Sequence, residues 1–164
     1  MKTNKQVGFT LIEIMIVVTI VAILTGAAMM SFPRDTNDLL KEEADRIHAL
    51  LSLSQDEAIL QSRELAVGFN ETGYTFFALD NNTWSVYDDD VFRARRLPAD
   101  LLSQLYLEGI PIVLEKKLVK PQVFILSSGE MTPFIYELQF PGKDERIKLE
   151  VNAIGDVKKE LLEK

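Results

Sequence analysis

The sequence contains no cysteine and only one histidine, His48, among its 164 residues. The lack of cysteine excludes disulfides and thiolate metal sites. It says little about the compartment, because an oxidising space permits disulfides without requiring them. A single histidine cannot build a histidine-rich metal site or a cysteine–histidine catalytic pair. The sequence also contains no G-x-S-x-G turn and no Walker-type glycine loop. We therefore expect no enzymatic activity, no metal and no cofactor.

Basic residues are also scarce, with 18 Lys and Arg against 25 Asp and Glu and a net charge of −7. Proteins that bind nucleic acid need a basic surface for the phosphate backbone, so no nucleic-acid partner is expected. The only dense basic cluster, Arg93, Arg95 and Arg96, follows the acidic run 88–90, and we predict that both are solvated loops. Residues 80–82 and 88–90 carry carboxylates without EF-hand spacing, which argues against a calcium site.

Charge is absent from residues 14–30. A helix of that length spans roughly 26 Å, and residues 9–12 extend it to bilayer length. Glu13 lies at the head of this run, although an acidic side chain at the membrane centre costs roughly 2.5–3.5 kcal/mol. Lys2 and Lys5 precede the run, and the next basic residue is Arg34. The positive-inside rule then predicts a cytoplasmic N-terminus.

A secretory signal peptide is the alternative explanation of this segment. Lys2 and Lys5 would form its basic region, residues 14–24 its apolar core, and residues 25–28 a small-residue cleavage site. Glu13 and the continued hydrophobicity of residues 29–32 argue against it. Residue types alone favour the membrane helix but leave both interpretations open.

The short basic leader, Gly8, Phe9 and Glu13, followed by the apolar run to residue 32, resembles the N-terminus of type IV pilins and type II secretion pseudopilins. The resemblance implies cleavage by a prepilin peptidase after Gly8 and N-methylation of Phe9. It also implies that Glu13 pairs with the terminal amine of a neighbouring subunit, since two membrane charges become tolerable when paired. An intrachain pair and a Glu13 that snorkels to the interface are the alternatives.

Beyond the apolar run, Pro33 should end or kink the helix, and Gly26 is a second weak point. Asn37 or Asp38 is expected to cap an amphipathic helix that extends to about Ser62. If the two helical stretches join through Pro33, they form one helix over residues 9–62, roughly 80 Å long. The predicted apolar stripe comprises Leu39, Leu40, Ile47, Leu50, Leu51, Leu53 and Ala58.

After residue 62 the pattern becomes that of β-structure. Strands are predicted at 65–69, 74–79, 84–87, 110–114, 123–126, 134–140 and 147–151. The last two should form a hairpin. Residues 100–107 fit either a helical turn or a strand, and residues 157–164 either a strand or a helix.

These elements predict an α+β fold. A long N-terminal α-helix, half in the membrane and half amphipathic, packs on an antiparallel β-sheet head, the arrangement that the resemblance to pilins implies. The expected organisation is a leader peptide at 1–8, a transmembrane helix at 9–32, an amphipathic helix joining the head at 33–62, and a periplasmic β-rich domain at 63–164.

A second informative segment lies at residues 127–134. Locally it reads as a turn, in which Gly129 is free to take a positive φ and Pro133 restricts Thr132 to extended geometry. It also resembles the Ser-Gly-Glu-x-Thr-Pro-Phe signature of H-type minor pseudopilins of type II secretion, and more loosely that of T-type minor fimbrial pilins. The matching residues are Ser128, Gly129, Glu130, Thr132, Pro133 and Phe134.

The resemblance implies a minor pseudopilin that is built into the periplasmic pseudopilus and supports export of folded proteins across the outer membrane. Glu13 implies a place beneath the tip, because the cap subunit of the family lacks this glutamate. The implied partners are other minor pseudopilins, the major pseudopilin, the prepilin peptidase, the inner-membrane assembly platform and membrane lipid.

The implied location is the bacterial inner membrane, crossed once, with a cytoplasmic N-terminus and a periplasmic C-terminal domain. The alternative function is that of a T-type minor type IV pilin, acting in pilus biogenesis or DNA uptake. The acidic composition and the lack of cysteine favour the pseudopilin.

Overall fold

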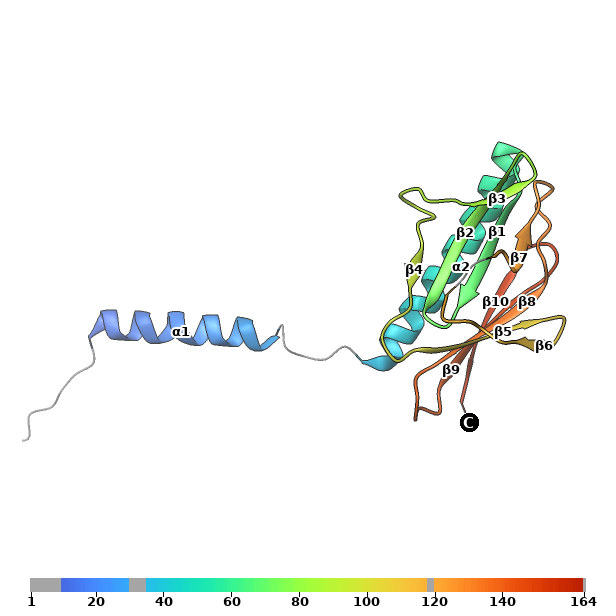
Figure 1. Ribbon diagram of the computed structural model, residues 1–164. Coiled ribbons are helices and arrows are strands. Elements are labelled where there is room, and N and C mark those ends of the chain that lie inside the picture. The colour runs from blue at the N-terminus through green and yellow to red at the C-terminus, as the bar shows by residue number, and fades with distance from the viewer. Residues whose placement is uncertain (1–9, 30–34, 118–119, 164) are drawn as a thin grey trace, which may run out of the picture. The chain divides into compact units, whose positions relative to one another are not determined.

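The computed structural model describes residues 10–29, 35–117 and 120–163 (Figure 1). The chain divides into two units, Met1–Arg34 and Asp35–Lys164, and we refer to the second as the head. The first unit holds helix α1 (Leu11–Met29), and the head begins with helix α2 (Thr36–Gln61). The predicted continuity of one helix through Pro33 falls on residues 30–34 and lies outside the described residues.

Helix α2 starts two or three residues earlier than its sequence suggested. Asp35 is the N-cap, and its side chain accepts a hydrogen bond from the backbone N–H of Asn37 at 3.1 Å. The prediction of Asn37 or Asp38 as the cap is therefore wrong, because Asp35 satisfies one of the free N–H donors in the first turn, that of Asn37. The helix ends at Ser62 as predicted, with Ser62 in the left-handed conformation at φ 50°.

The buried face of α2 is narrower than the predicted stripe. Leu53 is 48% exposed, and Leu39 is only partly buried. Leu53 lies about 120° around the helix from the centre of the buried face, which explains why the prediction for this residue is wrong. His48 is half-buried on this helix. The buried apolar residues of α2 are Leu40, Ala44, Ile47, Leu50, Leu51 and Ala58.

The strands of the head form two antiparallel sheets. Sheet A has the order β3-β2-β1-β7, with the short β4 also paired to β2, and sheet B has the order β10-β9-β8-β5-β6. The strands are β1 (Leu65–Asn70), β2 (Gly73–Asp80), β3 (Thr83–Val86), β4 (Arg95–Arg96), β5 (Leu102–Leu107), β6 (Ile110–Ile112), β7 (Val123–Ile125), β8 (Phe134–Gln139), β9 (Arg146–Val151) and β10 (Val157–Leu162).

The structure confirms the predicted fold class and decides the ambiguous segments. Residues 102–107 and 157–162 are strands, and β8 and β9 form the expected hairpin, with Phe134 opposite Val151. The prediction of a solvated loop is wrong for two of the three clustered arginines. Arg95 and Arg96 pair with Tyr74 and Gly73 as strand β4. The backbone N–H and C=O groups of β2 offer a partner that the charge pattern could not indicate.

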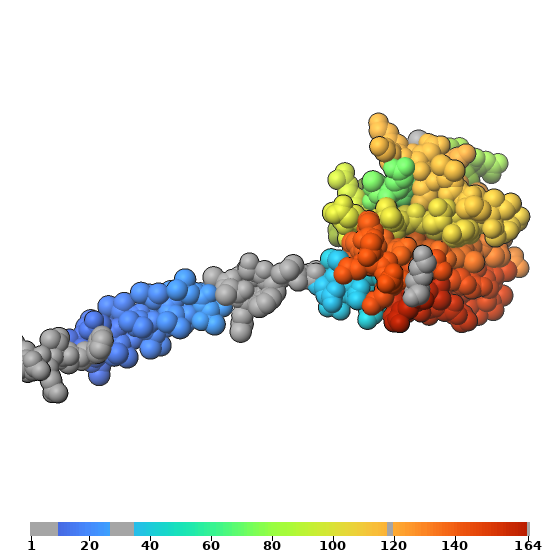
Figure 2. Space-filling view, turned by 90° about the horizontal axis from the view of Figure 1, so that it is seen from below, coloured from blue at the N-terminus to red at the C-terminus, as the bar shows by residue number. Residues whose placement is uncertain are grey.

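The two sheets and α2 enclose one core within the head. Helix α2 contacts β1 and β7 of sheet A and β8 and β9 of sheet B. Phe69 of sheet A joins the two sheets, because its ring centroid lies 4.4 Å from that of Tyr136 and 5.8 Å from that of Phe134. Seen from the end where α2 begins, the cyan first turns of this helix reach the surface beside the orange-to-red strands of sheet B (Figure 2).

Candidate functional site

The sequence points to two candidate assembly elements, the N-terminal segment and the signature turn. Gly8 and Phe9, the predicted processing residues, lie outside the described residues. Glu13 lies in the first turn of α1, where its backbone N–H bonds to the hydroxyl of Thr10 at 3.3 Å and to its carbonyl at 3.1 Å. A carboxylate in a first turn is favoured by the helix dipole. Its side chain is exposed and therefore accessible to a second molecule.

Helix α1 is apolar on all sides. Its only hydroxyls within the described range, on Thr19 and Thr25, donate back to the carbonyls of Met15 at 2.8 Å and Val21 at 2.7 Å, which satisfies them inside the helix. A helix without a polar face normally packs in a protein core or in lipid. Side chains that are at least half exposed are Leu11, Ile12, Ile14, Met15, Ile16, Val17, Val18, Ile20, Val21, Ile23 and Leu24.

Among the residues that the structure describes, no helix is both long enough and apolar enough to cross a membrane. The described part of α1 stops at Met29. The transmembrane helix at residues 9–32 therefore stays a prediction.

The signature turn connects sheet A to sheet B. It begins after β7 and ends at β8, and the backbone of Leu126 and Glu130 closes it through an N–H···O bond of 2.8 Å. The N–H of Gly129 bonds to the carbonyl of Leu126 at 2.9 Å. Gly129 has φ +89°, which confirms the predicted positive φ. Ser128 supports the turn, since its hydroxyl accepts from the N–H of Glu130 at 3.4 Å.

The second half of the signature holds the turn against both sheets. Thr132 pairs with Phe124 of β7 twice, accepting from its N–H through the hydroxyl at 3.1 Å and donating its own N–H to the carbonyl at 2.9 Å. Pro133 separates Thr132 from β8 and is exposed. Phe134 is 3% exposed and packs on Phe69 in the core. The structure thus brings the six signature residues together, far along the chain from Glu13.

Gln55 of α2, which the sequence did not single out, fastens the signature turn to the helix. Its side-chain amide donates to the carbonyl of Gly129 at 2.6 Å and to that of Ile154 at 2.8 Å. A Cβ on Gly129 would lie 3.0 Å from Cδ1 of Ile59, so helix and turn are in direct contact. In the sequence, only the position of Gln55 beside the apolar stripe could have indicated this contact, and such a position is weak evidence.

Glu43 is a second residue of α2 whose contacts the sequence analysis did not predict. It is 1% exposed and accepts hydrogen bonds from Nη1 of Arg46 at 2.6 Å and from the hydroxyl of Tyr74 at 3.2 Å. Burial raises the pKa of Glu43, and the charge of Arg46 opposes that shift. The sequence could have indicated that Glu43 lies on the buried face of α2, because it follows Leu40 by three residues and precedes Ile47 by four.

The acidic loops considered for calcium have structural partners instead. Asp80 pairs with Arg63, and Asp89 accepts hydrogen bonds from the N–H groups of Val91 at 2.8 Å and Phe92 at 2.6 Å. Within the described ranges no group of three or more metal-ligating side chains gathers.

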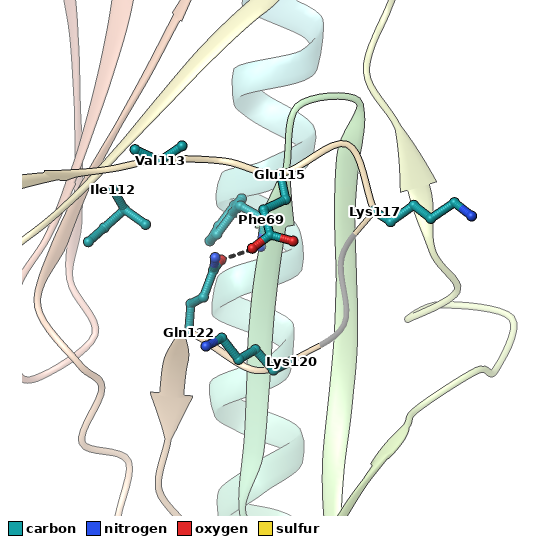
Figure 3. Close-up of a pocket in the computed structure, with 7 residues that line it drawn as sticks. All are labelled: Phe69, Ile112, Val113, Glu115, Lys117, Lys120 and Gln122. Carbon is teal, nitrogen blue, oxygen red and sulfur yellow. Dashed lines mark hydrogen bonds between the residues drawn. The ribbon is translucent and has the colours of Figure 1, made fainter.

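A hollow of about 190 Å³ lies where the loop after β6 passes the end of β1. Gln122 anchors this loop, because its side-chain oxygen accepts from the N–H of Phe69 at 2.7 Å. Lys117 extends from the loop toward β4, away from Glu115 (Figure 3). The lining residues are Phe69, Ile112, Val113, Glu115, Lys117, Lys120 and Gln122.

Comparisons with known proteins agree with these two elements. A profile described as Type II transport protein GspH matches residues 43–155, and one described as the prokaryotic N-terminal methylation motif matches residues 3–29. Type II secretion system protein H of Pseudomonas aeruginosa is 35% identical over 151 residues, covering 85% of this chain and 86% of that protein. The protein of the same name from Aeromonas hydrophila is 26% identical over 167 residues, covering 93% of this chain and 91% of that one.

The fold agrees as well. The solved structure of the minor pseudopilin EpsH from the type II secretion system of Vibrio cholerae matches with a TM-score of 0.62 at 26% identity, covering 76% of this chain and 96% of that one. The GspH match spans the signature turn and most of the head, while the methylation motif spans Glu13. Head, turn and N-terminal motif together show that the chain belongs to the GspH family of H-type minor pseudopilins of the type II secretion system.

Proposed function

We propose that this pseudopilin is cleaved by a prepilin peptidase after Gly8, methylated on Phe9, and held in the bacterial inner membrane by residues 9–32 with its head in the periplasm. The single observation that carries the proposal is α1, which is apolar on all sides and whose side chains are exposed from Leu11 to Leu24. Such a surface requires lipid or neighbouring helices around it.

Glu13 supplies the specific contact in this proposal. It is the acidic residue in the first turn of α1, and its carboxylate is exposed. In an apolar environment an unpaired carboxylate is costly, and a cationic amine from another subunit removes most of that cost. Pairing with the N-terminal amine of a neighbour would therefore set the position of each subunit along the pseudopilus.

The head is the part of the subunit that pairing through Glu13 would position. The signature turn, clamped between β7, β8 and α2, fixes sheet A to sheet B. In the proposed assembly the subunit lies beneath the tip, contacts other minor pseudopilins and the major pseudopilin, and is inserted by the inner-membrane assembly platform. Its role is structural support for the export of folded proteins across the outer membrane.

Mass spectrometry of the mature protein from its native host tests the processing step. We expect an N-terminal peptide that begins with methylated Phe9, and an unprocessed precursor when Gly8 is replaced by Leu. A substitution in the leader that keeps Gly8, such as Thr3→Ser, is the matched control and should be processed normally. A mature N-terminus near residue 28 would instead indicate signal-peptide cleavage and would overturn the proposal.

A further inference from the structure

The basic residues of the head fall into two groups. Six Lys and Arg of the described head form salt bridges, and none of them lies between residues 93 and 120. Residues 93–120 carry six other basic side chains, none of which pairs with a carboxylate of the described residues. In an acidic chain this separation gathers positive charge in one region, where Arg95 also interacts over a longer distance with the buried Glu43.

Four of these cations line one pocket of about 400 Å³ at the start of β2. They are Arg95 and Arg96 from β4, and Lys116 and Lys117 from the loop after β6. Asn70, Thr72 and Thr75 also line it, and the side-chain amide of Asn70 and the hydroxyl of Thr75 can donate hydrogen bonds, while the hydroxyl of Thr72 donates to Asn70 at 3.2 Å. The pocket therefore offers charge and donors together, the combination that binds phosphate groups. We refer to it as the basic pocket.

The backbone that forms the basic pocket is closely packed. A Cβ on Gly73 would lie 2.0 Å from the carbonyl oxygen of Arg95, so only glycine lets β4 approach β2 this closely. Nη2 of Arg95 donates to the carbonyl of Val91 at 3.0 Å, and Asp89 caps the turn before it. The buried Nε of Arg95 has no acceptor among the described residues.

The basic pocket lies beside the N-terminal part of α2. Tyr74, in the wall of the pocket, donates to Glu43, eight residues into the helix. Only residues 30–34 separate the end of α1 from Asp35, and an extended chain of that length reaches at most about 20 Å. In the anchored protein of the proposed function, this short connection keeps the start of α2 near the lipid headgroups, and the pocket beside this part of the helix is the site that we expect them to meet.

We propose that the basic pocket binds the phosphate groups of anionic phospholipids in the membrane that anchors the chain. Each Lys or Arg near an anionic leaflet contributes attraction that falls off within a Debye length, about 10 Å at 0.1 M salt. The contact is consequently local and acts despite the net negative charge of the chain. It orients the head on the membrane before assembly. This inference rests on the proposed membrane anchoring.

The experiment uses the head, residues 35–164, because its hydrophobic core, with the partly buried residues packed on it, lies between Leu39 and Val157. Co-sedimentation is measured with vesicles of phosphatidylcholine, with and without phosphatidylglycerol. The test variant is Lys116→Gln/Lys117→Gln. The matched control is Lys41→Gln/Lys143→Gln, which removes two exposed cations outside the pocket. Circular dichroism checks that both variants fold.

We expect the head to bind only the anionic vesicles. The affinity of the test variant for these vesicles should be at least tenfold lower than that of the parent head, and the affinity of the control should be within about twofold of it. Equal losses in the two variants, or no binding by the head, would overturn the proposal. Binding of inorganic phosphate without vesicle binding would assign the pocket to a free anion, and pocket-dependent binding of duplex DNA would assign it to nucleic acid. Both outcomes would contradict a lipid site. Processing at Gly8 is measured separately, so a failure of the proposed lipid site can be distinguished from a failure of the proposed membrane anchoring.

Discussion

Nε2 of Gln55 lies 2.6 Å from the carbonyl oxygen of Gly129, so one side chain of α2 holds the signature turn in place. The same nitrogen also donates to Ile154 at 2.8 Å, in the turn before β10. A Cβ on Gly155 would lie 2.2 Å from that amide, so any larger residue at this position would displace the Gln55 side chain. One side chain thus positions two turns that lie far from it in the sequence.

Replacing Gln55 by Leu should destabilise the head by about 1–3 kcal/mol, because two hydrogen bonds of about 0.5–1.5 kcal/mol each are lost. Urea unfolding of the head measures this. Gln61→Leu is the control, since Gln61 is exposed and bonds only to Glu57 of its own helix among the described residues. It should change stability by less than about 0.5 kcal/mol. Equal effects of the two substitutions would contradict a special role for Gln55.

Gly129→Ala should destabilise the head more than Gly142→Ala. Both glycines have positive φ, +89° and +72°, so both substitutions carry the backbone cost of about 1 kcal/mol. A Cβ at 129 also meets Ile59, whereas one at 142 meets no atom within 4 Å. Thermal or urea unfolding of both variants gives the difference, which should shrink in an Ile59→Val background because Cδ1 is removed. A difference that persists there would show that packing against Ile59 is not its cause.

The buried Glu43 predicts a pH dependence of stability. Burial raises its pKa above the usual value of 4.5, so the folded head binds this proton more tightly than the unfolded chain does. The stabilisation it contributes is complete below pH 4.5 and is lost as the pH rises through the raised pKa. The stability of the parent chain relative to Glu43→Gln, from urea unfolding at a series of pH values, should therefore fall as the pH rises through this window.

The neighbouring Glu42→Gln substitution provides the comparison for Glu43. The side chain of Glu42 is 54% exposed and lies 3.1 Å from Arg46, so it shares the partner without the burial. The decline with pH should therefore be larger for Glu43→Gln than for Glu42→Gln, because only Glu43 is buried. A difference for Glu43→Gln that stays flat, or that rises with pH, would mean that its salt bridge with Arg46 outweighs desolvation.

Sequence patterns predicted the parts of the fold that local physics controls. Apolar periodicity located α2, and alternation with turn residues located β1, β2, β8 and β9 to within one or two residues. The glycine in the signature indicated a positive φ at Gly129, which the structure confirms. These features depend on neighbours in the chain, so a single sequence carries the information.

Features that depend on distant contacts could not be predicted. Arg95 and Arg96 form a strand only because β2 supplies an edge to which they can pair. Gln55 acquires its role from two carbonyls that lie 74 and 99 residues further along the chain. Pairing partners and helix orientation are set by tertiary packing, and composition does not encode them.

The measurement that tests the central claim most directly is incorporation of a Glu13→Ala variant of the full chain into the pseudopilus of its native host. We expect normal cleavage and methylation, loss of cross-linking to neighbouring pseudopilins, and impaired secretion. Asp56→Ala, which removes an exposed carboxylate from α2 instead, should leave all three unchanged. Normal cross-linking and normal secretion by the Glu13→Ala variant would contradict the proposed pairing of Glu13 with a neighbouring subunit.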